Sequence, residues 1–168
     1  MPEHLEVVAF AAFAAVMAVA AIEDFRRLVI PNLLPVLLCL LWPVYLAATG
    51  PSLSGAAASL GCAALVFGLG AFLFARGLLG GGDVKLLSAA ALWAGPDGTG
   101  KLLMLTCVFG GVLALFMLLP VSRHLAMMLR RMLGQPLAEA GRGLSMPIPY
   151  GIAIAAAAVV VMRPPSLG

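Results

Sequence analysis

Long apolar stretches recur along the whole chain, and most of them are about as long as a helix that crosses a bilayer. Such a helix needs roughly 20 consecutive, mainly apolar residues. Hydrophobic residues make up 63% of the 168 residues, and charged residues make up 10%. A soluble domain of this size could not hide so much apolar surface, because its exterior needs more polar cover. The sequence therefore predicts an all-α, polytopic membrane protein.

The apolar runs predict about six transmembrane helices, with short Gly/Pro-rich turns after the second and the fourth. The first run ends in Glu-Asp rather than in a small-residue cleavage site, so we interpret it as a retained helix and not as a signal peptide. We expect a single membrane-embedded domain over residues 1–168, with no separate soluble or zinc-binding domain. The predicted spans cover residues 5–22, 33–49, 56–75, 78–95, 101–119 and 147–162.

Basic residues are distributed unevenly between the two sides of this predicted bundle. Eight of the ten Lys and Arg lie in or beside connections one, three and five: Arg26, Arg27, Arg76, Lys85, Arg123, Arg130, Arg131 and Arg142. Positive charge marks the cytoplasmic side of a membrane protein, so both termini are predicted to lie outside the cytoplasm. The basic residues form no stripe with interleaved aromatic residues, and nucleic acid is therefore not an expected partner.

The fifth connection, residues 121–146, is the one long loop of this arrangement. Its arginines alternate with leucines and methionines. This pattern predicts a helix that lies on the bilayer surface and is attracted to anionic lipid. Docking of a substrate is the alternative interpretation.

Asp24 and Asp83 are the two acids of the chain that lie beside membrane-length apolar segments with suggestive neighbours. Asp24 follows the first apolar run, and Asp83 stands in a Gly-Gly-Gly-Asp-Val-Lys segment at residues 80–85. An ionisable group in such a place is costly, which makes it a functional hypothesis by default. Two predicted spans separate the acids, so both are expected at the cytoplasmic face.

The fourth predicted span is short if its helix begins only after the glycines. Residues 84–95 would cover about 18 Å at roughly 1.5 Å per residue, against a hydrocarbon core of about 30 Å. Either this helix is re-entrant, or the Gly-Gly-Gly-Asp segment lies below the membrane surface. Irregular backbone at that depth needs protein or a water-filled cavity around it. Because glycines permit unusual dihedral angles and close approach of another chain, we expect a wet crevice that contains an acid.

Two carboxylates held close together suit the hydrolysis of a peptide bond. They share a proton, so one acts as a general base on water while the other polarises the scissile carbonyl. This chemistry needs no metal and no cofactor, and we expect neither, since the two histidines are isolated and the cysteines form no Cys-x-x-Cys pair. The alternatives are that Asp83 caps the following helix and that Asp24 pairs with Arg26, Arg27 or Lys85. For Lys85, a role in tuning the local potential stands beside that of an ordinary snorkelling lysine.

Three sequence blocks resemble the signatures of the prepilin peptidase family of membrane aspartic peptidases. Residues 24–32, Asp-Phe-Arg-Arg-Leu-Val-Ile-Pro-Asn, resemble the first block, an acid followed by a spacer and Ile-Pro-Asn. Residues 80–87 match the Gly-x-Gly-Asp-x-Lys-Leu block, with Gly81 at the variable position. Residues 147–151, Pro-Ile-Pro-Tyr-Gly, are similar to the C-terminal Pro-Tyr/Phe-Gly segment.

This resemblance implies an endopeptidase of the bacterial inner membrane that removes the short basic leader of type IV prepilins at the cytoplasmic face. A prepilin presents its leader ahead of a hydrophobic helix that is still in the bilayer, so its cut site lies at the interface where the two acids are expected. By motif matching, Asp24 and Asp83 carry over as the catalytic pair. The residues expected to shape the site are Gly80, Gly82, Lys85, Pro31 and Asn32.

The chain also departs from the larger, bifunctional enzymes of that family, which carry a cytoplasmic insertion with paired Cys-x-x-Cys motifs and N-methylate the new terminus. The insertion is missing here, so the chain resembles the minimal form found with Tad/Flp-type pilus systems, and methyltransferase activity is not expected. Two alternatives stay open. One is an intramembrane aspartic protease resembling signal-peptide peptidase, in which the first acid typically follows a tyrosine, whereas Glu23 precedes Asp24 here. The other is a small proton-coupled carrier that uses the same two acids.

Overall fold

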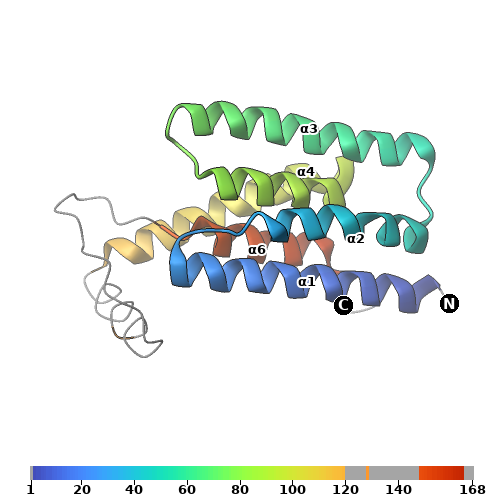
Figure 1. Ribbon diagram of the computed structural model, residues 1–168, viewed down its shortest axis with the longest axis horizontal. Helices are drawn as coiled ribbons and strands as arrows, with labels where there is room; N and C mark the ends of the chain where they lie inside the picture. Colours follow the sequence, from blue (N-terminus) through green and yellow to red (C-terminus); the bar gives the residue numbers. More distant parts are fainter. Residues whose placement is uncertain (1, 120–127, 129–147, 165–168) are drawn as a thin grey trace.

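The computed structural model describes residues 2–119, 128 and 148–164, and the regular secondary structure of that part of the chain is all helical (Figure 1). This confirms the all-α class for the described residues. The loop predicted to bind anionic lipid, residues 121–146, lies outside the described residues except for Met128. The helices are α1 (Pro2–Arg27), α2 (Leu33–Thr49), α3 (Leu53–Ala75), α4 (Gly81–Leu118) and α6 (Tyr150–Met162).

Three of these helices are long and apolar enough to cross a membrane: His4–Arg27, Leu53–Ala75 and Gly81–Leu118. The other two, α2 and α6, are shorter apolar helices. The surface of the bundle is covered with large apolar side chains such as Leu53, Leu115 and Leu118, which explains why the chain needs a bilayer. The protein is therefore a helical membrane protein.

Helix α1 is longer than predicted. It continues past residue 22 to Arg27, so that Asp24 is a helical residue and the connection to α2 shrinks from about ten residues to the five residues 28–32. The basic side chains in the last turn favour this extension, because they interact well with the negative end of the helix dipole. The helix ends at Arg27, because the next residue, Leu28, adopts a left-handed φ of 54°.

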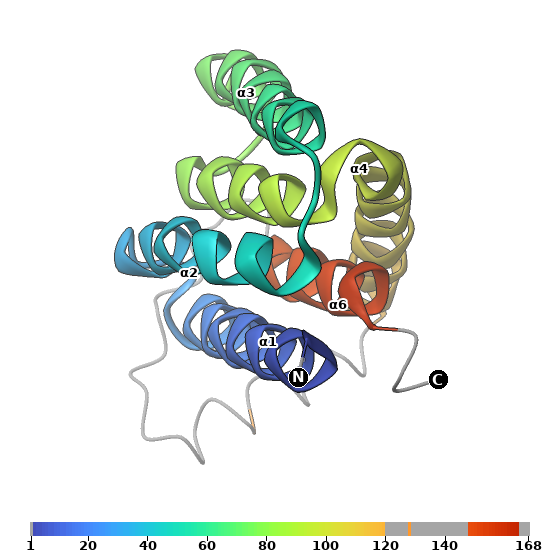
Figure 2. The same cartoon turned by 90° about the vertical axis from the view of Figure 1, so that its right-hand side faces the viewer.

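A turn is predicted after the fourth span, at residues 95–100, and the chain does turn there, but the turn is shorter than predicted: the chain is helical from Pro96 onward and departs from helical dihedral angles only at Gly95. There α4 divides into two arms, and the chain reverses its direction between them (Figures 1 and 2). Gly95 has φ 62° and ψ −170°, a combination that is essentially restricted to glycine. Pro96 suits the first position of the second arm, where a backbone N–H would have no helical partner.

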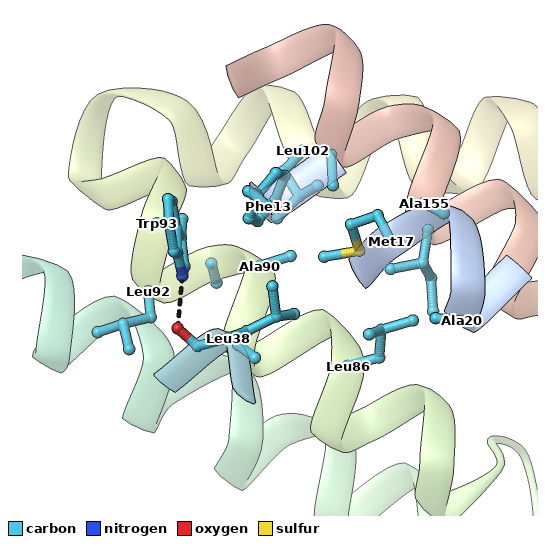
Figure 3. Packing of buried hydrophobic residues seen from close by; sticks show 14 of the residues in the cluster. Phe13, Met17, Ala20, Leu38, Leu86, Ala90, Leu92, Trp93, Leu102 and Ala155 are labelled. Carbon is cyan, nitrogen blue, oxygen red and sulfur yellow. Dashed lines mark hydrogen bonds between the residues drawn. The ribbon is translucent and has the colours of Figure 1, made fainter. Parts of the chain in front are cut away.

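The first arm of α4 forms the centre of the bundle, between α3 on one side and α2 and α6 on the other (Figure 2). Its alanines 89–91 are buried and let the neighbouring helices approach closely. The Trp93 indole N–H donates a hydrogen bond to the Leu38 carbonyl at 2.9 Å (Figure 3). The Trp93 ring packs on the rings of Phe13 and Tyr45. One side chain thus ties α1, α2 and α4 together. Helix α3 is peripheral, with only Val66 and Gly70 buried.

The reversal at Gly95 predicts a specific sensitivity to substitution. We expect Gly95→Ala to lower the free energy of unfolding by about 1–3 kcal/mol, because φ 62° strains an L residue and the new Cβ would lie 3.0 Å from Ser59 Oγ. Unfolding in mild detergent measures this change. Gly100→Ala, in the same helix but with no atom within 4 Å of the new Cβ, is the matched control and should be neutral or slightly stabilising. Equal stability of the two variants would contradict the assigned strain.

Candidate active site

Asp24 lies on the buried face of α1. The apolar residues Ala9, Phe13, Met17 and Ala20 precede it at intervals of three or four, which places all five side chains on one stripe of the helix. Asp24 is only 6% exposed. The sequence alone does not single out this stripe, because residues 7–22 are apolar all around the helix and include the exposed Val8, Val19 and Ile22.

The first turn of α6 supplies the hydrogen-bond partner of Asp24. The backbone N–H of Gly151 donates a hydrogen bond of 2.7 Å to Asp24 Oδ2. This N–H is one of those that an α-helix leaves without an internal partner, and the N-terminal end of a helix favours a negative charge. A Cβ on Gly151 would lie 2.8–3.0 Å from three atoms of Asp24, so only glycine allows this approach.

Asp83 lies in the first turn of α4, where it is half-buried. The N-cap residue is Gly80, so the interpretation of Asp83 as the cap itself is wrong. Its carboxylate turns back toward the backbone of Gly80. Two helices separate Asp83 from Asp24 in the sequence, but Gly82, next to Asp83, contacts Ile30 in the segment that follows the last turn of α1. The last turn of α1 and the first turns of α4 and α6 all lie at the same end of the bundle, on the left in Figure 1.

The three glycines before Asp83 do not form irregular backbone, contrary to the expectation from the sequence. Gly81 and Gly82 are the first helical residues of α4, and none of the three has a positive φ. Their use is close approach. A Cβ on Gly80 would lie 2.6 Å from Asp83 Oδ2, and a Cβ on Gly82 would lie 3.0 Å from Ile30 Cβ. The glycines therefore make room for the acid and for the segment that follows α1.

The blocks at residues 24–32 and 80–87 dock on each other at two points. Gly82 packs against the buried Ile30, and Lys85 Nζ donates a hydrogen bond of 2.8 Å to Asn32 Oδ1. Asn32 is the N-cap residue of α2, but its side chain makes no capping bond and is instead turned to Lys85. Pro31 begins the turn into α2, and its carbonyl accepts a hydrogen bond from the Leu34 N–H. The structure thus brings all the predicted site residues to one region.

Pairing of Asp24 with nearby cations was the alternative explanation for this acid, and it is wrong for the described residues, where Asp24 takes part in no ion pair. Arg27 pairs with Glu23 at 3.2 Å, and Lys85 is bonded to Asn32. Arg26 Nε is buried and has no hydrogen-bond partner among the residues that the structure describes. Within the same part of the chain, no group of three or more His, Cys, Asp or Glu side chains is placed to hold a metal ion.

The contact between Gly151 and Asp24 could not be predicted from the sequence. The Pro-Ile-Pro-Tyr-Gly segment is visible at residues 147–151, and its glycine opens a helix. Nothing in the segment indicates that its backbone N–H meets a carboxylate 127 residues earlier in the chain.

Comparison with known proteins supports a membrane peptidase. Residues 11–115, which include both Asp24 and Asp83, match the sequence model of the type IV leader peptidase family. The match covers more than half of the 168 residues, and the chain belongs to this family. It is accordingly a protease of the prepilin-peptidase type. Comparisons with curated proteins and with solved structures gave no match.

The contact between Gly151 and Asp24 predicts the effect of one added methyl group. We expect Gly151→Ala to reduce peptidase activity at least about tenfold, because the new Cβ displaces the Asp24 carboxylate by a few tenths of an ångström or more. Gly111→Ala is the matched control, since its Cβ meets no atom within 4 Å, and it should retain wild-type activity. Both variants are compared at equal amounts in the membrane. Wild-type activity of Gly151→Ala would show that the position of Asp24 is unimportant.

Proposed function

We propose that this protein is an aspartic endopeptidase that removes the leader of type IV prepilins, with Asp24 and Asp83 as the catalytic pair. One observation carries the proposal: two acids from separate signature blocks lie at the same end of the bundle, and among the described residues Asp24 is held by a backbone N–H and not by an ion pair. Family membership supports the peptidase activity, and the geometry supports the choice of these two residues.

In the proposed reaction, the ionised carboxylate of the pair takes a proton from a water molecule. The water oxygen attacks the carbonyl carbon of the scissile bond, while the protonated partner donates a hydrogen bond to the carbonyl oxygen. The tetrahedral intermediate then collapses, the C–N bond breaks and a proton passes to the leaving nitrogen. The products are a leader with a new carboxylate and a mature pilin with a free amine.

Gly151 contributes to this reaction by holding Asp24. Its N–H occupies Oδ2, so Oδ1 is the oxygen that remains for water or for the shared proton. A carboxylate that is fixed by a backbone donor at a helix end needs little reorganisation when charge moves during the reaction. Gly151 is thus a positioning residue, and Asp24 and Asp83 are the groups that touch the reacting atoms.

We further propose that the chain forms one membrane-embedded domain with six spans, in which each arm of α4 is a separate crossing. The first arm, residues 81–94, is about 21 Å long at roughly 1.5 Å per residue, so it is shorter than the hydrocarbon core. A short arm places Asp83 below the membrane surface. The charges support a cytoplasmic active site in the bacterial inner membrane, because Arg26, Arg27, Arg76 and Lys85 lie toward the site.

We also propose that the substrates are prepilins of the Flp type and that the protein has no methyltransferase activity. Only five residues join α1 to α2, which leaves no room there for the zinc-binding insertion of the bifunctional enzymes. Mass spectrometry of the cleaved pilin should accordingly find a free N-terminal amine without an added methyl group.

The paired-acid mechanism predicts the effect of removing either acid. Asp24→Asn and Asp83→Asn keep the side-chain volume but abolish the ionisable group, so each should reduce leader removal by about a thousandfold or more in a reconstituted assay with a prepilin. Both proteins should still accumulate in the membrane. Asp97→Asn changes an exposed acid in the second arm of α4 and is the matched control. Full cleavage of the prepilin by either site variant would contradict the mechanism. If the wild-type protein instead transported protons and cleaved no prepilin, the result would favour a carrier.

The proposed topology predicts which loops a membrane-impermeant reagent reaches. In a variant without its native cysteines, Pro51→Cys lies in the exposed turn between α2 and α3, and Leu78→Cys lies in the exposed turn between α3 and α4. A maleimide applied to intact spheroplasts should label Pro51→Cys and leave Leu78→Cys unlabelled until the membrane is permeabilised. The opposite pattern would place the acids outside the cytoplasm.

A further inference from the structure

An apolar groove lies between α2 and α3, with the first arm of α4 as its floor. Its volume is about 590 Å³. Val36, Cys39 and Leu40 of α2 form one wall, and Ala64 and Phe67 of α3 form the other. Both helices pack on α4 more extensively than on each other, which leaves the space between them open. Because large apolar side chains surround its mouth, the groove opens toward the bilayer and not toward water.

The polar end of this groove is formed by two side chains from the segments that carry the site. Asn32 and Lys85 belong to the lining, and Lys85 follows Asp83 by two residues. Ser88 also lines the groove, but its hydroxyl donates to the Val84 carbonyl of its own helix at 2.7 Å. Away from Asn32 and Lys85, an occupant therefore meets almost only apolar atoms. The groove fits a chain that is polar at one end, beside the acids, and apolar beyond it.

We propose that this groove binds the apolar transmembrane helix of the substrate, on the side of the cut that stays in the membrane. The inference rests on the proposed function, in which a peptide bond at the polar end of such a helix must reach Asp24 and Asp83. Lys85 and Asn32 line one end of the groove, and Lys85 lies two residues after Asp83, so a helix that enters from the bilayer would bring its first residues beside the site. Contacts of this kind hold the scissile bond in place without using the leader, which makes the groove a specificity site for the mature part of the substrate.

A second apolar cavity, between the second arm of α4 and α6, fits this role less well. Its volume is about 290 Å³, half that of the groove. Phe109 and Ile152 are among its lining residues, and the lining includes no charged side chain. It offers the polar end of a substrate no partner comparable to Lys85.

Cross-linking tests which surface the substrate helix touches. Cys39 lines the groove, whereas Cys107 is exposed on the second arm of α4, so each can be kept as the single cysteine of an otherwise cysteine-free chain. An Asp83→Asn background prevents cleavage. A prepilin with one cysteine, moved through the first turns of its apolar helix, should form a disulfide with Cys39 at one register and with Cys107 at none. A link to Cys107, or to neither cysteine because lipid fills the groove, would overturn the inference.

Filling the groove gives a second, functional test. Ala64→Trp should reduce cleavage of full-length prepilin in membranes by at least about tenfold, as expected from losing the burial of one apolar side chain of the substrate. Ala57→Trp, on an exposed part of the same helix outside the groove, should cleave like the wild type. If Ala64→Trp cleaved prepilin as well as the wild type, the proposed role of the groove would be refuted, while the proposed peptidase function would stand. Failure of the wild-type protein to cut any prepilin would instead refute the proposed function.

Discussion

Asp24 is an acid enclosed between membrane helices, and its free energy depends on the donor that faces it. Burial of an unpaired carboxylate is costly, and the bilayer offers no water to compensate. Here the donor is a backbone N–H at the start of α6, which would itself be unsatisfied without a partner. Two groups that are each unfavourable alone thus satisfy one another. This bond ties the last turn of α1 to the first turn of α6 and brings both to the end of the bundle where α4 begins.

Glycines make the remaining contacts of the site possible, because they have no side chain and let other groups approach their backbone closely. Gly151 admits the carboxylate of Asp24, Gly80 admits that of Asp83, and Gly82 admits Ile30. In each case the new Cβ would lie at 3.0 Å or less from its nearest neighbour, a distance that real Cβ atoms do not show or seldom show. The site is therefore assembled by close packing of helices rather than by flexible loops. Helical elements hold the acids more firmly than loops do, which suits a reaction that needs fixed geometry.

The central arm of α4 serves both the core and the proposed chemistry. Its first turn carries Asp83 and Lys85, and its last turn carries Trp93, which holds α1 and α2 in place. Between them, small buried residues allow α2 and α3 to flank the arm without closing over it. The groove that results is lined at one end by Asn32 and Lys85, which belong to the segments that carry the site. A membrane peptidase needs a path from the bilayer to its site, because its substrate is apolar while its second reactant, water, is not.

Much of this protein follows from its sequence, because the bilayer imposes a strong and local rule. Apolar runs of membrane length predict the helices, the positive charges indicate an orientation, and the sequence motifs single out Asp24 and Asp83. The motifs also identify the family, which the match over residues 11–115 confirms. Tertiary structure alone decided the remainder. The docking of Gly82 on Ile30, the hydrogen bond between Lys85 and Asn32, and the bond between Gly151 and Asp24 depend on which helices meet. Such contacts join residues far apart in the chain, so no local pattern encodes them.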